Sequence, residues 1–147
     1  MQLFESIEDA RLRLASTGYL VDDDLATVVF LADALGKPLL LEGPAGTGKT
    51  ELAKAVAAAT GASLVRLQCY EGLDEARALY EWNYRKQLLR IQAAQANASA
   101  DADAWSDLHD DIFSEEFLLS RPLLTAIRQE GPTVLLVDET DKADVEV

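Results

Sequence analysis

Residues 43–50 carry the clearest chemical signal in the chain, the string GPAGTGKT. The string matches G-x-x-x-x-G-K-[ST], in which glycines allow successive backbone N–H groups to turn toward one anionic centre. Lys49 supplies a point charge for the β- and γ-phosphates of a nucleotide, and Thr50 supplies a hydroxyl ligand for Mg²⁺. We therefore expect a polyphosphate site at this loop. The residues expected to contact the nucleotide are Gly43, Pro44, Ala45, Gly46, Thr47, Gly48, Lys49, Thr50 and Glu51.

A second chemical signal is the apolar run at residues 134–137, which ends in Asp138 and Glu139. A buried strand that ends in an acid places a carboxylate at the edge of the sheet where α/β proteins bind ligands. Asp138 is expected to hold Mg²⁺ through water, with Thr50 as the hydroxyl ligand, and Glu139 to polarise the attacking water as general base. A kinase excludes water, so this acidic pair favours hydrolysis over phosphoryl transfer. The predicted catalytic residues are Glu139 and Lys49.

The elements that must position these residues follow an α/β order. Leu39–Leu41 is a short apolar run between turn residues and predicts a buried strand that leads into the loop. Residues 49–60 have helical periodicity and end at Gly61. Residues 63–69 alternate apolar and polar side chains and predict a second strand. We expect a three-layer P-loop core, with a parallel sheet between helices.

The rest of the chain divides into units flanking this core. Residues 1–36 predict two helices, the second running from the acids at 22–24 to Leu35. Residues 37–69 form the phosphate-loop unit. Residues 70–132 predict a helical insert with an acidic loop: helical stretches at 74–96, with a break near Asn83, and at 116–130, which Pro122 interrupts or restarts. Residues 133–147 contain the last strand and the start of the next helix.

Composition limits the classes of function. The chain has 147 residues and a formal net charge of −13, which argues against a nucleic-acid partner because such proteins neutralise phosphates with basic side chains. No apolar run reaches the length of a bilayer span, and the acidic N-terminus does not resemble a targeting peptide. The single cysteine, Cys69, excludes an internal disulfide and favours the reducing cytoplasm.

Three segments together resemble the MoxR family of AAA+ ATPases. They are Leu39–Lys54 (LLLEGPAGTGKTELAK), Leu67–Gln92 (LQCYEGLDEARALYEWNYRKQLLRIQ) and Phe117–Asp144 (FLLSRPLLTAIRQEGPTVLLVDETDKAD). The phosphate loop alone indicates only a P-loop NTPase, whereas the strings CYEGLDEA and LYEWNY narrow the resemblance to the MoxR family. The branch resembled is associated with carbon monoxide dehydrogenase and related molybdenum hydroxylases.

The resemblance implies a homo-hexameric ring ATPase with chaperone-like action, which uses ATP or ADP and Mg²⁺. It also implies a metalloenzyme client and a von Willebrand factor A-domain partner. Lys49 and Thr50 correspond to the Walker A residues, and Asp138 and Glu139 to the Walker B residues. Tyr19, Leu20 and Val21 stand where the family often covers the adenine, and the alternative is that they pack against a helix entrance. No N-K-x-D string specifies guanine, so ATP is favoured over GTP.

The family places its sensor residue, arginine fingers and helical lid after the Walker B strand, and this sequence has no counterpart of them. In the family's strand order, 5-1-4-3-2, the strand at 39–41 then loses both neighbours. We therefore expect an N-terminal part of a longer protein, truncated after Walker B. Two functions stay open: ATP hydrolysis in the full-length form, or nucleotide binding or partner docking without turnover. The isolated chain is expected to hydrolyse ATP very slowly, since an arginine finger contributes about 10³–10⁵ in rate.

Overall fold

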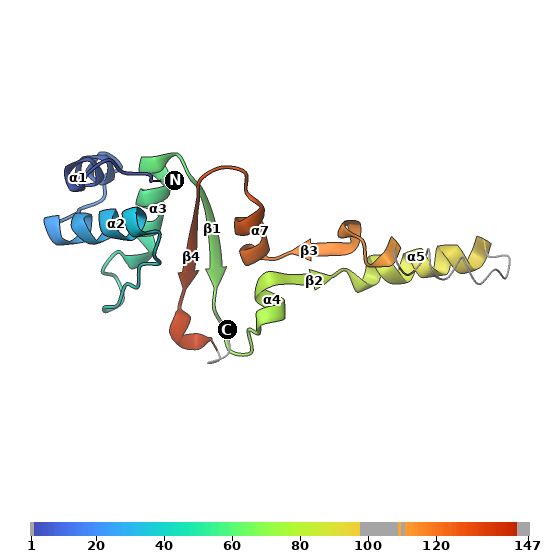
Figure 1. Ribbon diagram of the computed structural model, residues 1–147. Coiled ribbons are helices and arrows are strands. Elements are labelled where there is room, and N and C mark those ends of the chain that lie inside the picture. Colours follow the sequence, from blue (N-terminus) through green and yellow to red (C-terminus); the bar gives the residue numbers. More distant parts are fainter. Residues whose placement is uncertain (1, 98–108, 110, 144–147) are drawn as a thin grey trace.

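Two parallel strands form the centre of the protein, with helices on both faces (Figure 1). The computed structural model describes residues 2–97, 109 and 111–143. Strand β1 (Ser63–Gln68) pairs in parallel with β4 (Thr133–Asp138). Helix α3 (Lys49–Thr60) packs on one face of this pair, and α7 (Pro122–Arg128) packs on the other. The predicted fold class, a parallel α/β core between helical layers, is confirmed.

The two predicted N-terminal helices are present as α1 (Ile7–Ser16) and α2 (Asp23–Leu35). Each begins where a side chain accepts a hydrogen bond from a free backbone N–H of the first turn, Ser6 for α1 and Asp22 for α2. Helix α2 ends at Gly36, whose φ of 59° lies in the left-handed region that glycine adopts without strain. Local sequence signals thus determine both helices.

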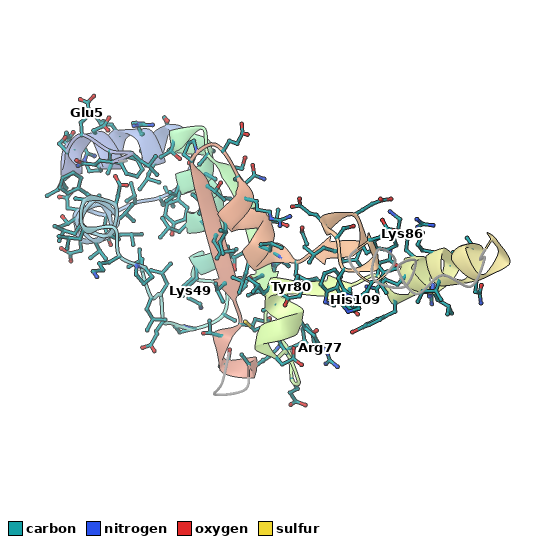
Figure 2. The ribbon with its side chains drawn as sticks, turned by 45° about the vertical axis from the view of Figure 1, so that its right-hand side comes forward. Glu5, Lys49, Arg77, Tyr80, Lys86 and His109 are labelled. Carbon is teal, nitrogen blue, oxygen red and sulfur yellow. The ribbon has the colours of Figure 1, made fainter. Side chains whose placement is uncertain are left out.

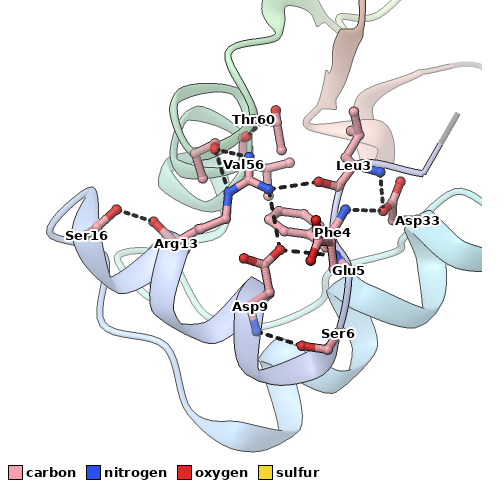
Figure 3. Close-up of polar contacts among 11 residues, drawn as sticks. Leu3, Phe4, Glu5, Ser6, Asp9, Arg13, Ser16, Asp33, Val56 and Thr60 are labelled. Atoms are coloured by element: carbon pink, nitrogen blue, oxygen red, sulfur yellow. Dashed lines mark hydrogen bonds and ion pairs between the residues drawn. The ribbon is translucent and has the colours of Figure 1, made fainter.

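The first apolar core forms where α1, α2 and α3 meet. Its buried members are Phe4, Ala10, Leu14, Val29, Leu52 and Ala55. Figure 3 shows the polar contacts around it: Asp33 accepts hydrogen bonds from the backbone N–H groups of Leu3 and Phe4, at 2.7 and 2.9 Å. Arg13 donates to the carbonyl oxygens of Leu3, at 2.9 Å, and Ala59. The N-terminal segment is therefore fixed to the helix that follows the phosphate loop.

A second, smaller core lies on the α7 side of the sheet. It contains Leu67, Cys69 and Leu73, together with Ala78 of the short helix α4 (Glu75–Leu79). Cys69 is 2% exposed. Burial is the main cause that raises the pKa of its thiol, and the nearby carboxylates of Asp138, Asp141 and Glu139 raise it further. Cys69 is therefore a buried apolar side chain in its neutral form.

An arm projects from the core between α4 and α7 (Figure 1). It consists of the antiparallel strands β2 (Tyr80–Trp82) and β3 (Leu118–Ser120), the helix α5 (Tyr84–Asn97) and the 3₁₀ turn η1 (Glu115–Phe117). The helices predicted at 74–96 and 116–130 are wrong at these two strands. The aromatic and branched side chains of β2 and β3 favour a strand once a pairing partner is available, and each strand's partner is distant in sequence. The predicted break near Asn83 and restart at Pro122 are confirmed.

The strand predicted at Leu39–Leu41 is wrong. This segment has no regular secondary structure and pairs with no strand among the described residues. Leu39 and Leu41 pack against the first core, while Leu40 is 71% exposed. The predicted burial of residues 134–137 is also wrong, since Leu135 and Val137 are 37% and 41% exposed. In this two-stranded sheet β4 has a neighbour on one side only, which leaves its side chains partly exposed.

Most of the predicted acidic loop, and the end of the helix expected after β4, lie outside the described residues. Directly after β4 the chain forms a 3₁₀ turn, η2 (Thr140–Lys142). Within residues 2–97, 109 and 111–143, no helix is both long enough and apolar enough to cross a membrane.

Candidate phosphate-binding site

The phosphate loop leads directly into α3. Gly46 and Gly48 both have a φ above 80°, a conformation that side-chain-bearing residues rarely adopt, and Gly48 is the residue that precedes the helix. The backbone of the loop therefore depends on glycine at these positions. Lys49, the first residue of α3, lies on the side of the sheet away from the arm, whereas Lys86 and His109 lie along the arm (Figure 2). The sequence prediction of a loop followed by a helix start is confirmed.

The ammonium group of Lys49 points back into its own loop. Its Nζ donates to the carbonyl oxygens of Gly43 and Pro44, both at 2.6 Å, and lies 3.5 Å from the Thr47 hydroxyl. The Thr47 hydroxyl in turn donates to the Pro44 carbonyl at 3.0 Å. The lysine thus has neutral oxygen partners inside the loop, and a phosphate would offer it charged ones, which form the stronger hydrogen bonds.

Thr50 and Asp138 meet although 88 positions separate them in sequence. The Thr50 hydroxyl donates to Asp138 Oδ2 at 3.3 Å, across the gap between the start of α3 and the end of β4. A hydroxyl and a carboxylate are the hard oxygen ligands that Mg²⁺ prefers, and Mg²⁺ commonly takes only one or two groups from the protein and the rest from phosphates and water. The residues present therefore fit the ion. In the described part of the chain, no cluster of three or more His, Cys, Asp and Glu side chains could hold a metal by itself.

Glu139 follows Asp138 in an unusual backbone conformation. Its φ of 56° and ψ of 47° are left-handed, and it is the single residue other than glycine with a positive φ in the described ranges. Lys142 Nζ lies 2.5 Å from Glu139 Oε2, and this hydrogen bond is the main cause that raises the pKa of Lys142. The conformation directs Glu139 out of the line of β4, into a pair with Lys142 in the next turn. Its assignment as general base stays a prediction.

A pocket of about 470 Å³ lies beside the loop, between the residues after α1 and the outer side of α3. It is lined by Thr17, Gly18, Tyr19, Leu20, Gly46, Thr47, Gly48, Glu51, Lys54, Ala55 and Ala58. The Tyr19 hydroxyl donates to the Gly48 carbonyl at 3.4 Å, and burial raises the pKa of this phenol. Leu20 is 96% exposed, so its apolar side chain is free to cover a ligand. The structure therefore brings Tyr19, Leu20 and Glu51 to one pocket at the loop.

Three charged residues lie at the site without having been predicted there from the sequence. Arg66 on β1 lies 2.8 Å from Asp138 Oδ2, Lys142 pairs with Glu139, and Lys54 lines the pocket and pairs with Glu51 at 2.5 Å. Lys142 and Lys54 each lie three positions from their partner, and this spacing in a helical turn is a usable sequence signal. Arg66 carries no such signal, since its contact depends on how β1 and β4 pair.

A glycine-rich loop that leads into a helix, with the acid at the end of β4 held against the start of that helix, is the phosphate site of a P-loop NTPase core. The comparison with protein families matches residues 39–146 to the ATPase family associated with various cellular activities (AAA). This match covers well over half of the chain, and the protein belongs to the AAA family. The comparisons with curated proteins and with solved structures gave no significant match.

Proposed function

We propose that this chain binds ATP with Mg²⁺ at residues 43–51, and that it hydrolyses ATP as a MoxR-type AAA+ ATPase. Membership of the AAA family supports ATP binding and hydrolysis in general. In the proposal Lys49 contacts the β- and γ-phosphates, and Thr50 and Asp138 hold Mg²⁺. Glu139 is the general base, and Tyr19 and Leu20 cover the adenine. Bound Mg²⁺ would neutralise the charge that develops on the phosphates.

One observation carries the proposal, the 3.3 Å contact between Thr50 and Asp138. Thr50 is fixed by the phosphate loop, and Asp138 by the pairing of β4 with β1. Cys69 N donates to the Asp138 carbonyl at 2.9 Å and extends this pairing beyond the strand ends. Two rigid elements thus bring a metal-binding hydroxyl and a metal-binding carboxylate together beside a phosphate-binding loop. A glycine-rich turn that binds no ligand would not require the Asp138 carboxylate beside the Thr50 hydroxyl.

The first test separates binding from turnover. Lys49→Ala is expected to abolish binding of a fluorescent ATP analogue, because it removes the cation that meets the phosphates. Glu139→Gln is expected to retain binding and to lose phosphate release, measured over long incubations. Lys37→Ala and Glu42→Gln, exposed residues just before the loop, are the charge-matched controls. Equal loss of binding and turnover in Glu139→Gln contradicts the base assignment, and wild-type binding in Lys49→Ala contradicts the site.

The alternative function is nucleotide binding or partner docking without turnover. The observation that favours it is the hydrogen bond between Glu139 and Lys142, which engages the carboxylate that has to accept a proton from water. Under this alternative the wild-type chain binds the ATP analogue as tightly as Glu139→Gln does, and neither protein releases phosphate above the Lys49→Ala background.

The proposal extends to assembly and client. We propose a homo-hexamer that remodels or matures a metalloenzyme together with a von Willebrand factor A-domain protein, on the strength of the MoxR resemblance alone. Sedimentation of the protein with and without Mg²⁺ and a non-hydrolysable ATP analogue tests the assembly. A mass that stays that of one chain in both conditions contradicts a nucleotide-dependent ring of this chain.

A further inference from the structure

Asp138 already has a cationic partner in this structure. Arg66 Nη2 lies 2.8 Å from Asp138 Oδ2, the same carboxylate oxygen that accepts the Thr50 hydroxyl at 3.3 Å. Arg66 also donates to the side-chain amide oxygen of Gln68. The second carboxylate oxygen, Oδ1, accepts the backbone N–H of Glu139 at 3.1 Å. Both oxygens of the expected metal ligand are therefore engaged by the chain itself.

The register of the sheet produces this contact. Arg66 lies opposite Leu136, and Gln68 lies opposite Asp138, so the side chains at 66, 68 and 138 share one face. That face is the one that carries Thr50, since Thr50 on α3 contacts Asp138. The side chain of Asp138 is 18% exposed, whereas that of Arg66 is 53% exposed. The carboxylate is held in place, and the long arginine side chain has room to leave it.

We infer that Arg66 is the internal counter-ion of Asp138 in the nucleotide-free protein, and that Mg²⁺ displaces it when the metal–nucleotide complex binds. The inference rests on the proposed function of residues 43–51. Arg66 and a metal ion held by Asp138 would be two cations at one carboxylate, and like charges at this distance repel each other. The Arg66 side chain is more than half exposed, so its guanidinium can move into water at a small cost. Arg66 thus lowers the apparent affinity for Mg²⁺ and keeps Asp138 oriented until the metal arrives.

The same geometry allows the opposite role, and the two roles predict opposite signs. If Arg66 only positions Asp138 for the metal, removing it weakens Mg²⁺ binding. If Arg66 competes with the metal, removing it tightens Mg²⁺ binding. An exposed ion pair changes an equilibrium by about two- to fivefold, which sets the scale of the expected effect.

The test measures the Mg²⁺ dependence of nucleotide binding. A fluorescent ATP analogue is held at fixed concentration while Mg²⁺ is raised from zero, and the Mg²⁺ midpoint is compared between wild type and Arg66→Gln. Arg66→Lys keeps the charge without the planar guanidinium, and its Mg²⁺ midpoint is expected to lie between those of the wild type and Arg66→Gln. Arg90→Gln is the matched control, because Arg90 pairs with Asp111 at 2.6 Å on the arm. Electron paramagnetic resonance of Mn²⁺, under the same conditions, measures the bound metal directly.

The Mg²⁺ midpoint of Arg66→Gln is expected to lie about two- to fivefold below that of the wild type. Binding of the ATP analogue to Arg66→Gln in EDTA is expected to equal that of the wild type. The Mg²⁺ midpoint of Arg90→Gln is expected to equal that of the wild type. An unchanged or higher midpoint in Arg66→Gln, with nucleotide binding intact, overturns the counter-ion role and leaves the proposed function standing. Absence of nucleotide binding by the wild-type protein, with or without Mg²⁺, overturns the proposed function and this inference together.

Discussion

Arg13 is the residue whose replacement tests most directly how α1 is attached to the phosphate-loop helix. Its Nε donates to the Ala59 carbonyl at 3.0 Å and its Nη1 to the Leu3 carbonyl at 2.9 Å, and its guanidinium carbon lies 5.2 Å from the centre of the Phe4 ring. Ala59 is in the last turn of α3, where carbonyl groups lack helical partners. One side chain therefore satisfies the end of α3 and holds the N-terminal segment over the core.

We predict that Arg13→Met lowers the free energy of unfolding by about 2–3 kcal/mol. A hydrogen bond from a charged donor contributes about 1.5–3 kcal/mol, and a cation–π contact about 0.5–1 kcal/mol at an exposed site. The side chain of Arg13 is 36% exposed, so water takes over part of the lost hydrogen bonding, and the sum is reduced accordingly. Methionine keeps the apolar stem, so the change reports on the guanidinium.

The matched control is Arg11→Met in the same helix. Arg11 pairs with Glu8 on the surface at 2.6 Å, a contact that contributes little to stability because water screens both groups. Urea unfolding followed by circular dichroism measures both variants, and the slope with urea should stay constant while the midpoint falls. In a thermal scan, Arg13→Met should unfold about 6–9 °C below wild type. A loss in Arg13→Met within about 0.5 kcal/mol of the control would refute the reasoning.

Two further predictions concern local features. Cys69 should react slowly with a thiol reagent in the folded chain and fast in concentrated urea, because burial raises the pKa of its thiol and shields it. Fast labelling of the folded chain at neutral pH would contradict the burial. The thiol of the unfolded chain ionises at lower pH than the thiol of the folded chain, so this group stabilises the fold at neutral pH. Its contribution is lost as pH rises through the pKa of the folded state. Gly36→Ala should lower the free energy of unfolding in urea by about 1 kcal/mol, since φ at this position is 59°. The control Gly131→Ala, at a glycine without positive φ, should change stability little. Equal effects of the two substitutions would contradict the strain argument.

Much of the fold could be predicted from the sequence because its signals are local. The acids before α2, Gly36 after it and Gly61 after α3 set helix ends without reference to any distant residue. The phosphate loop is equally local, since the glycines and Lys49 act within one turn of chain. Fold class and the position of Asp138 then follow from the alternation along β1 and from the apolar run of β4.

The failures share a cause, which is pairing between segments distant in sequence. Leu39–Leu41 has the composition of a buried strand, but a strand also requires a hydrogen-bonded neighbour, and no described strand pairs with this segment. Tyr80–Trp82 reads as helix until β3 lies beside it. Arg66 looks like a solvent-facing strand residue, and its contact with Asp138 appears only once the register is known.

The arm leaves and re-enters the core at one point: Arg121 N donates to the Leu79 carbonyl at 3.2 Å. Because the arm begins and ends at two residues that are neighbours in space, the number of residues in the arm does not affect how the core closes beneath it. Insertions or deletions between these two anchors do not change the spacing between β1 and β4, and so do not disturb the contact between Thr50 and Asp138. The arm can therefore vary in length while the phosphate-binding geometry stays constant, and its base lies between α4 and α7, both of which pack at the second core.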